Sequence, residues 1–344
     1  MLFRSLISED AHRLLASALA SRGILLLPQR HMSETVAADV ANSLALFTSL
    51  YGDPPDQHFY ITEIPYAEGV SFPGMIDLSW GTFQNTSVDG FDEFFRAHEA
   101  AHQWWGNGVR PASYRDAWLG EGLAEFAGLL YLQTARRHND EYYRFLDQYR
   151  TNILNHRDDT GPIAIGHRSS TPDVPRGYDI QVYQKGAWVL HMLRLMMLDL
   201  GTLRADRFSA MLRDFYATYR GNVATTDDFA AIVERHLGMP MVWFFDQWVR
   251  GTELPEYHVA WMSQPTDGGR FRVRLRVTQE HVSPDFHMPV LVAVDLGDSR
   301  TARFRVDVRS DQTEYASPLL PAEPQHLTFN EFHSVLAEVR MEAW

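Results

Sequence analysis

The sequence predicts an α+β protein in which a mainly helical domain precedes a small antiparallel β-sandwich. Two observations support this. Apolar residues recur at helical spacing through much of residues 91–248. After residue 251 the pattern changes: Phe271, Val273, Leu275 and Val277 alternate with arginines, the period of a half-buried strand. At 344 residues, the chain has room for roughly two domains of ~150 residues.

The change of pattern divides the chain into three parts. Residues 1–30 are interpreted as an N-terminal segment, either a remnant or a linker, with a short helix at 11–21 and a short strand at 24–27. Residues 31–252 are expected to form the helical domain and residues 253–344 the sandwich. Within the second part, a helix at 33–50 comes first, and strands at 58–63 and 70–79 follow it.

The helices expected after residue 90 are separated by glycine and proline signals. They cover residues 91–105, 117–137, 180–200, 203–219, 227–237 and 240–250, with a loop at 161–177. The strands expected in the sandwich cover residues 257–262, 271–277, 289–296, 303–308 and 326–329.

Composition excludes several function classes. The formal net charge of −13 disfavours binding to a phosphate backbone, so no nucleic-acid partner is expected. No stretch approaches the ~18 apolar residues that cross a bilayer. The absence of cysteine rules out thiolate nucleophiles and cysteine-type zinc sites. Residues 1–10 lack a basic segment followed by a long apolar one, so we expect a cytoplasmic protein, or an exported one if the chain is a fragment.

The main chemical signal is the HExxH pentad at residues 98–102. On a helix, His98 and His102 are four residues apart and project from one face, so two ring nitrogens can reach one zinc ion at ~2.0–2.1 Å. Glu99 points to the side, where it can reach a water molecule without being a ligand. Such a pair of histidines can also be merely solvated or packed on a helix.

Glu121 is a candidate third ligand. It follows His102 after 18 intervening residues, early in the next expected helix. Zinc peptidases of the gluzincin type take their third ligand from a glutamate in this position, whereas the layout HExxHxxGxxH fails because Trp105 and Gly108 occupy its last two positions. Glu121 has a second interpretation as an ordinary acid at a helix N-terminus, where the helix dipole favours negative charge.

Four motifs together resemble the M1 family of zinc aminopeptidases. They are HEAAHQWWGN at 98–107, WLGEGLAEF at 118–126, YQKGAWVLHMLR at 183–194 and FFDQWVRGTELP at 244–255. The resemblance covers roughly residues 35–344. It implies a thermolysin-like catalytic domain followed by a β-sandwich domain, a peptide substrate and one zinc ion per chain.

The resemblance also implies residue roles. His98, His102 and Glu121 would bind zinc, Glu99 would act as the general base, and the Tyr183 hydroxyl would stabilise the tetrahedral intermediate. Without the resemblance, Tyr183 would be interpreted as a core aromatic. Glu125 lies four residues beyond Glu121 and is either a hydrogen-bond acceptor for a zinc-bound histidine or a plain surface acid.

Two features depart from the family pattern. The family's GxMEN glutamate, which binds the free α-amine of the substrate, has no counterpart in the matching stretch GVSFPGM at residues 69–75. The neighbouring Glu68 is the candidate substitute. The large N-terminal β-domain of the family and its C-terminal helical domain are also missing from this sequence.

Three functions therefore stay open. The first is zinc-dependent release of N-terminal residues from peptides. The second is a zinc-containing peptide-binding or scaffold domain without turnover, and the third is an endopeptidase or another hydrolase that uses the same site. The pattern leaves substrate preference and oligomeric state undetermined.

Overall fold

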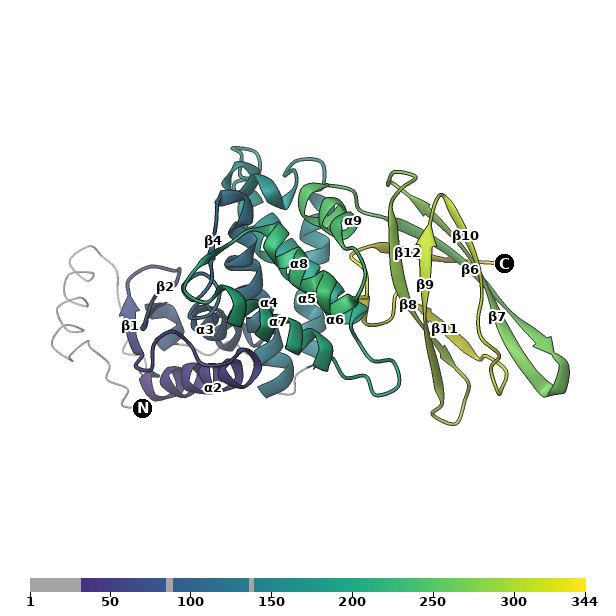
Figure 1. Ribbon diagram of the computed structural model, residues 1–344, viewed down its shortest axis with the longest axis horizontal. Coiled ribbons are helices and arrows are strands. Elements are labelled where there is room, and N and C mark those ends of the chain that lie inside the picture. Colours follow the sequence, from purple (N-terminus) through teal and green to yellow (C-terminus); the bar gives the residue numbers. More distant parts are fainter. Residues whose placement is uncertain (1–31, 85–88, 136–138) are drawn as a thin grey trace.

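The computed structural model describes residues 32–84, 89–135 and 139–344. It confirms the α+β class, with helices grouped before residue 250 and long strands after it (Figure 1). The expected helix at 11–21 and strand at 24–27 lie outside the described residues. The α-helices are α2 (Ser33–Tyr51), α3 (Phe91–Ala101), α4 (Glu121–Ala135), α5 (Asn139–Asn155), α6 (Gly186–Met196), α7 (Asp206–Tyr219), α8 (Thr226–Leu237) and α9 (Val242–Phe245).

A small sheet of order β1-β3-β2 lies at one end of the helices, opposite the long strands (Figure 1). Its strands are β1 (Tyr60–Ile64), β2 (Val70–Phe72) and β3 (Met75–Ser79). The expectation of one strand over 70–79 is wrong, because the chain turns back at Gly74. The φ of +72° at Gly74 suits glycine, and β2 pairs antiparallel to β3 as the edge strand.

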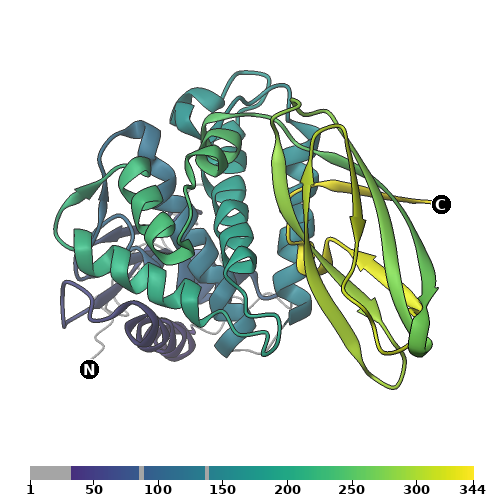
Figure 2. The same ribbon diagram turned by 45° about the vertical axis from the view of Figure 1, so that its right-hand side comes forward.

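The strands after residue 255 form two further sheets, which lie beside the helices in both ribbon views (Figures 1 and 2). One sheet has the order β10-β7-β6-β12 and the other β11-β8-β9. Their bounds are β6 (Glu256–Thr266), β7 (Arg270–Glu280), β8 (His287–Asp295), β9 (Thr301–Arg309), β10 (Gln312–Ala316), β11 (His326–Phe329) and β12 (Glu338–Glu342). The expectation of purely antiparallel pairing is wrong at one place, since β12 runs parallel to β6.

Several other elements differ from expectation. Helix α5 was not predicted, although its buried residues recur at helical spacing: Tyr142, Phe145, Leu146, Tyr149 and Ile153. Helix α4 begins at Glu121 rather than 117, because a 3₁₀ turn (Tyr114–Leu119) precedes it. The segment expected as one helix from 180 begins as a π-helical turn (Asp179–Lys185) that leads into α6. Two residues, Val223–Ala224 (β5), pair in parallel with Arg110–Pro111 (β4).

Helices α3 and α4 approach closely because small residues face large ones. A Cβ at Gly128 would lie 2.9 Å from the ring of Phe94, so the α4 backbone packs directly on an aromatic of α3. Helix α3 is also tied to α2 by the fully buried Arg96, whose guanidinium lies 2.6 Å from Asp39. The pairing compensates the buried charges, and it holds in place the helix that carries the HExxH pentad.

The helices and the C-terminal sheets share one continuous apolar core. Polar contacts also join them. In α6, the ring of His191 lies 2.9 Å from the carbonyl of Phe332, and Arg305 of β9 donates to the carbonyls of Leu195 and Leu198. The two parts are therefore packed against each other rather than joined only by a linker.

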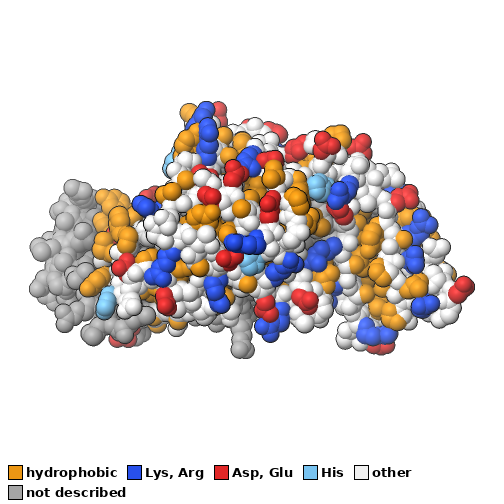
Figure 3. Space-filling view, in the orientation of Figure 1, with side chains coloured by type: hydrophobic (Ala, Val, Ile, Leu, Met, Phe, Trp, Pro, Cys, Tyr) orange, Lys and Arg blue, Asp and Glu red, His pale blue; other side chains and the backbone are white. Residues whose placement is uncertain are grey.

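Within the described ranges, none of the helices has the length and apolar character that crossing a bilayer requires. Acidic and basic side chains are interspersed over the face shown in Figure 3.

Candidate active site

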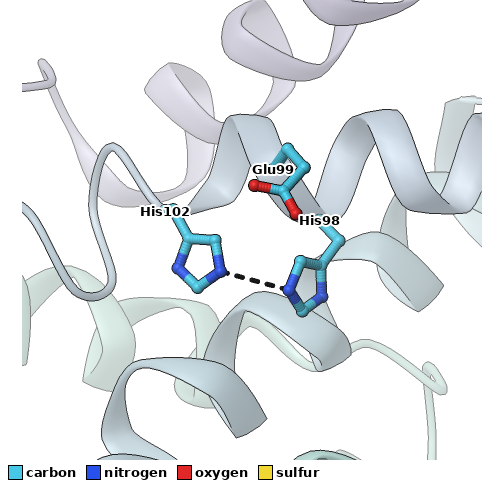
Figure 4. Close-up of side chains that lie close together, drawn as sticks. All are labelled: His98, Glu99 and His102. Atoms are coloured by element: carbon cyan, nitrogen blue, oxygen red, sulfur yellow. Dashed lines mark hydrogen bonds between the residues drawn. The ribbon is translucent and has the colours of Figure 1, made fainter. Parts of the chain in front are cut away.

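The two histidines of the HExxH pentad point toward one another (Figure 4). His98 lies in the last turn of α3, and His102 is the residue that ends the helix. Their Nε2 atoms are 3.1 Å apart. Two nitrogens bound at 2.0–2.1 Å to one tetrahedral ion would be about 3.3 Å apart. The helix therefore brings both rings close to a ligand-like separation.

The first residue of α4 brings a carboxylate to the same point. Oε2 of Glu121 lies 3.3 Å from Nε2 of His102 and 3.9 Å from Nε2 of His98. Its helix is held by the preceding 3₁₀ turn, in which Asp116 accepts hydrogen bonds from the backbone and hydroxyl of Thr226. The structure thus gathers the three residues that the sequence assigned to the metal.

Each histidine has an acceptor near its other ring nitrogen. Nδ1 of His102 lies 2.8 Å from the carbonyl of Trp105, and Nδ1 of His98 lies 2.9 Å from Oε2 of Glu125. Oε1 of Glu125 accepts a hydrogen bond of 2.5 Å from Tyr149. In neutral rings these acceptors favour protons on both Nδ1 atoms, which leaves the Nε2 lone pairs directed at one another.

At 3.1 Å the two Nε2 atoms can share a proton or bind one cation, so the donor set fits a metal ion. Two imidazoles and one carboxylate, with room for a fourth ligand, are the donors typical of catalytic zinc. His98, Glu99 and His102 also form a group whose ligand atoms all lie within 4.8 Å of one another.

In the absence of a cation, protons are attracted to the same place. Burial lowers the pKa of His102, but the charge and hydrogen bond of Glu121 outweigh burial and raise that pKa to about 9. Burial raises the pKa of Glu121, but the charge and hydrogen bond of His102 lower it to about 2. The cluster therefore concentrates negative potential where a cation would bind.

Glu99 lies beside the two rings (Figure 4), with a carboxylate oxygen within 4.8 Å of a ring nitrogen of each histidine, and is buried. Its carboxylate oxygen Oε2 lies 3.0 Å from the hydroxyl of Ser71. Since the side chain borders the open cavity described below, it can contact a water molecule there.

Tyr183 lies in the π-helical turn before α6, with its ring stacked on that of His98 at 5.8 Å between centroids. Burial and the neighbouring Glu121 charge raise the pKa of Tyr183 well above its usual range. The phenol therefore stays protonated at any physiological pH and can donate a hydrogen bond.

These side chains line an open cavity of about 640 Å³. Glu68 is exposed on its wall, next to the start of β2, and Arg176 and Asp179 line it too, 3.1 Å apart. Aromatic and aliphatic side chains provide an apolar part of the wall, namely Val70, Phe91, Phe94 and Phe95.

Sequence reasoning missed three neighbours of the site. Tyr149 belongs to the unpredicted helix α5. Gly69 and Ser71 contact Glu99, and the sequence pattern of this segment indicates only the missing glutamate. In contrast, His191, expected to be a core histidine, is buried and has partners on both nitrogens.

Part of the chain matches a known protein family. The model of the peptidase family M1 domain matches residues 93–248. This match agrees with the resemblance drawn from the motifs.

Curated relatives of the M1 domain are aminopeptidases. Aminopeptidase M1-B of Oryza sativa subsp. japonica is 30% identical over 162 residues, which cover 46% of this chain and 18% of that protein. Aminopeptidase A of Gloydius brevicauda is 30% identical over 165 residues, 46% of this chain and 16% of the relative. This chain thus spans less than a fifth of the length of these relatives.

The similarity to a solved structure extends beyond the residues that match the M1 domain model. The crystal structure of Legionella pneumophila aminopeptidase A in complex with aspartic acid aligns with a TM-score of 0.65 and 16% sequence identity. The alignment covers 89% of this chain and 35% of that one. At this identity the likeness concerns the fold alone.

Proposed function

We propose that this protein is a zinc-dependent peptidase that releases N-terminal residues from peptides. The observation that carries the proposal is the convergence of His98, His102 and Glu121 on one point of a cavity that Glu99 and Tyr183 also line. The M1 domain and the aminopeptidase relatives support the same activity.

The metal would be held by Nε2 of His98, Nε2 of His102 and the carboxylate of Glu121. When bound, zinc polarises a carbonyl and lowers the pKa of water to about 7. The two Nδ1 acceptors, Glu125 and the Trp105 carbonyl, hold the rings in the tautomer that leaves Nε2 free to bind.

Glu99 is proposed as the general base. Its carboxylate would take a proton from the attacking water and pass it to the leaving amine, a function typically worth ~10²–10⁴-fold in rate. The Tyr183 hydroxyl would donate a hydrogen bond to the oxyanion of the tetrahedral intermediate. Its raised pKa suits a donor that must not ionise.

Exopeptidase specificity requires an anchor for the free α-amine of the substrate. Glu68 is our candidate, because it is exposed on the cavity wall beside β2 and its charge is opposite to that of an ammonium group. An endopeptidase is the second candidate function, since Ser71 rather than an acid faces Glu99 from the same wall.

We also propose the domain assignment that the family implies. Residues 31–252 would form a thermolysin-like catalytic domain and residues 253–344 a β-sandwich domain. Residues 1–30 would be a separate N-terminal segment, and the protein would act in the cytoplasm.

The experiment measures zinc content and the hydrolysis of aminoacyl-amide reporters, together with a peptide and its N-acetylated twin. An aminopeptidase should cleave the free-amine peptide and reject the acetylated one, whereas equal cleavage would support the endopeptidase. Zinc-loaded protein that cleaves no substrate, and is unaffected in peptide affinity by Glu99→Gln, would instead indicate a non-catalytic binding domain.

A further inference from the structure

The side chain of Glu99 rests against residues 69–71, which lead into and form the edge strand β2. The hydroxyl of Ser71 lies 3.0 Å from Oε2 of Glu99 and 2.7 Å from its backbone carbonyl. On the same segment, Gly69 lies directly against the carboxylate. Two residues of one short segment therefore contact the group proposed as the general base.

Because Gly69 has no side chain, the Glu99 carboxylate can occupy the space beside its Cα. A Cβ placed on Gly69 would lie 2.4 Å from both Cδ and Oε1 of Glu99, closer than real side chains approach. The φ of Gly69 is not positive, so its backbone does not require glycine. The close approach of Glu99 is therefore the structural reason for glycine at this position.

Ser71 can serve Glu99 in both of its protonation states. A hydroxyl has one proton and two lone pairs. While Glu99 is ionised, the hydroxyl can donate to Oε2. Once Glu99 carries the proton, the hydroxyl can donate to the Glu99 backbone carbonyl and accept from the carboxylic acid, and no heavy atom needs to move.

The segment that holds Glu99 is itself fastened to the end of α3. Gln103 donates to the carbonyl of Phe72 at 3.0 Å and accepts from the amide of Gly74 at 3.0 Å. Asn107 donates to the carbonyl of Ser71 at 3.2 Å. Since these amides follow the HExxH pentad closely in the chain, the distance between Ser71 and Glu99 is set by local contacts.

We propose that Gly69 and Ser71 are positioning residues that hold the Glu99 carboxylate in one orientation toward the reacting water. The inference rests on the proposed function, since it assigns them to the base of that reaction. Ser71 acts through its hydroxyl, and Gly69 acts through the absence of a side chain.

Ser71→Thr and Ser71→Val form the test for the hydroxyl, because the two variants have the same shape and differ only in that group. We expect Ser71→Val to lower kcat by about 10- to 100-fold, the usual cost of losing an outer partner of a catalytic group. KM and zinc content should change little. Ser71→Thr should recover most of the lost kcat, and equal kcat values for Thr and Val would overturn the role of Ser71.

Gly69→Ala tests whether Glu99 needs the space that the absent side chain of Gly69 leaves. Its methyl group meets the end of a flexible side chain, so the protein should fold and bind zinc while Glu99 is displaced and kcat falls. Gly81→Ala is the matched control, because a Cβ there makes only an ordinary 3.5 Å contact with Ser79. A kcat for Gly69→Ala equal to that of Gly81→Ala would contradict the proposal.

A structural measurement separates this inference from the proposed function. Crystal structures of Ser71→Val and Gly69→Ala should show the Glu99 carboxylate rotated or in several orientations, and the wild type should show one. If the wild-type protein cleaves nothing, the proposed function fails and these structures still decide the positioning. An unchanged Glu99 in both variants would overturn the inference.

Discussion

Oε2 of Glu125 lies 2.9 Å from Nδ1 of His98, and both side chains are buried between α3 and α4. The other oxygen of Glu125 accepts the hydrogen bond of Tyr149 from α5. With one oxygen bound by Tyr149, the carboxylate lies close enough to Nδ1 to favour the tautomer that carries its proton there. Residues from α4 and α5 thus orient the candidate metal ligand His98 of α3.

Glu125→Gln should weaken zinc binding by about 10- to 100-fold, because an amide is a poorer acceptor and supports the ligand histidine less well. Competition titrations with a metal chelator would measure the affinity. Glu314→Gln, on the exposed face of β10, is the matched control. Equal affinities for the two variants would exclude this role for Glu125.

Removing a ligand and removing the base should have separable effects. Glu121→Ala should lose both zinc and activity, whereas Glu99→Gln should keep zinc and lose turnover by ~10²–10⁴-fold. Elemental analysis after dialysis, beside reporter kinetics, distinguishes the two. Loss of zinc from Glu99→Gln would mean that Glu99 is a ligand rather than the base.

Tyr183→Phe should lower kcat with little change in KM, as expected when an interaction forms only in the transition state. The loss should be near 10²–10³-fold, or ~2.7–4 kcal/mol, the usual cost of one oxyanion donor. Tyr60→Phe on exposed β1 is the control for the loss of a hydroxyl. Wild-type kcat in Tyr183→Phe would show that its role is packing against His98.

Zinc binding should release a proton near neutral pH. Without metal, the pKa of His102 is raised to about 9, so this ring is protonated at pH 7 and must lose its proton to bind a cation. Calorimetric titrations at pH 7 in buffers with different ionisation enthalpies would detect the release. A binding enthalpy independent of the buffer would contradict the prediction.

The raised pKa of His102 also predicts that the stability of the metal-free protein depends on pH. His102 gains a stabilising partner in its charged form, so its contribution to stability is fully present below pH 6.5 and is lost as the pH rises to about 9. Zinc-saturated protein should not show this loss, because the metal replaces the proton.

His191 should make the fold sensitive to acid. Burial lowers its pKa to about 3, and its nitrogens lie against the Tyr142 hydroxyl and the Phe332 carbonyl. Below pH 6.5 the unfolded chain binds a proton that folded His191 does not, so stability falls toward pH 3 by up to about 1.4 kcal/mol per pH unit.

Denaturant unfolding of wild type and His191→Gln over pH 7 to 4 would measure this effect. The variant should lose less stability than the wild type as the pH falls, because glutamine does not titrate. The same pH slope in both proteins would place the acid sensitivity elsewhere.

The amphipathic helices and alternating strands could be predicted because the spacing of their apolar residues is visible in short stretches of sequence. Helix α5 has the same helical period in its buried residues, so it too could have been predicted from the sequence. Strands β10 and β12 were missed because both are short and largely exposed, so their pairing comes from neighbouring strands rather than from their own apolar residues.

By itself, the sequence determined the chemistry available at the site. The spacing of His98, Glu99 and His102 sets their directions once the segment is helical, because the geometry of one helical turn is the same in every protein. The tertiary structure decided which distant groups join them. Contacts between separate elements depend on how those elements pack, and no local sequence period encodes that packing. Examples are the distance from Glu121 to the histidines, the Tyr149 bond to Glu125 and the contact of Ser71 with Glu99.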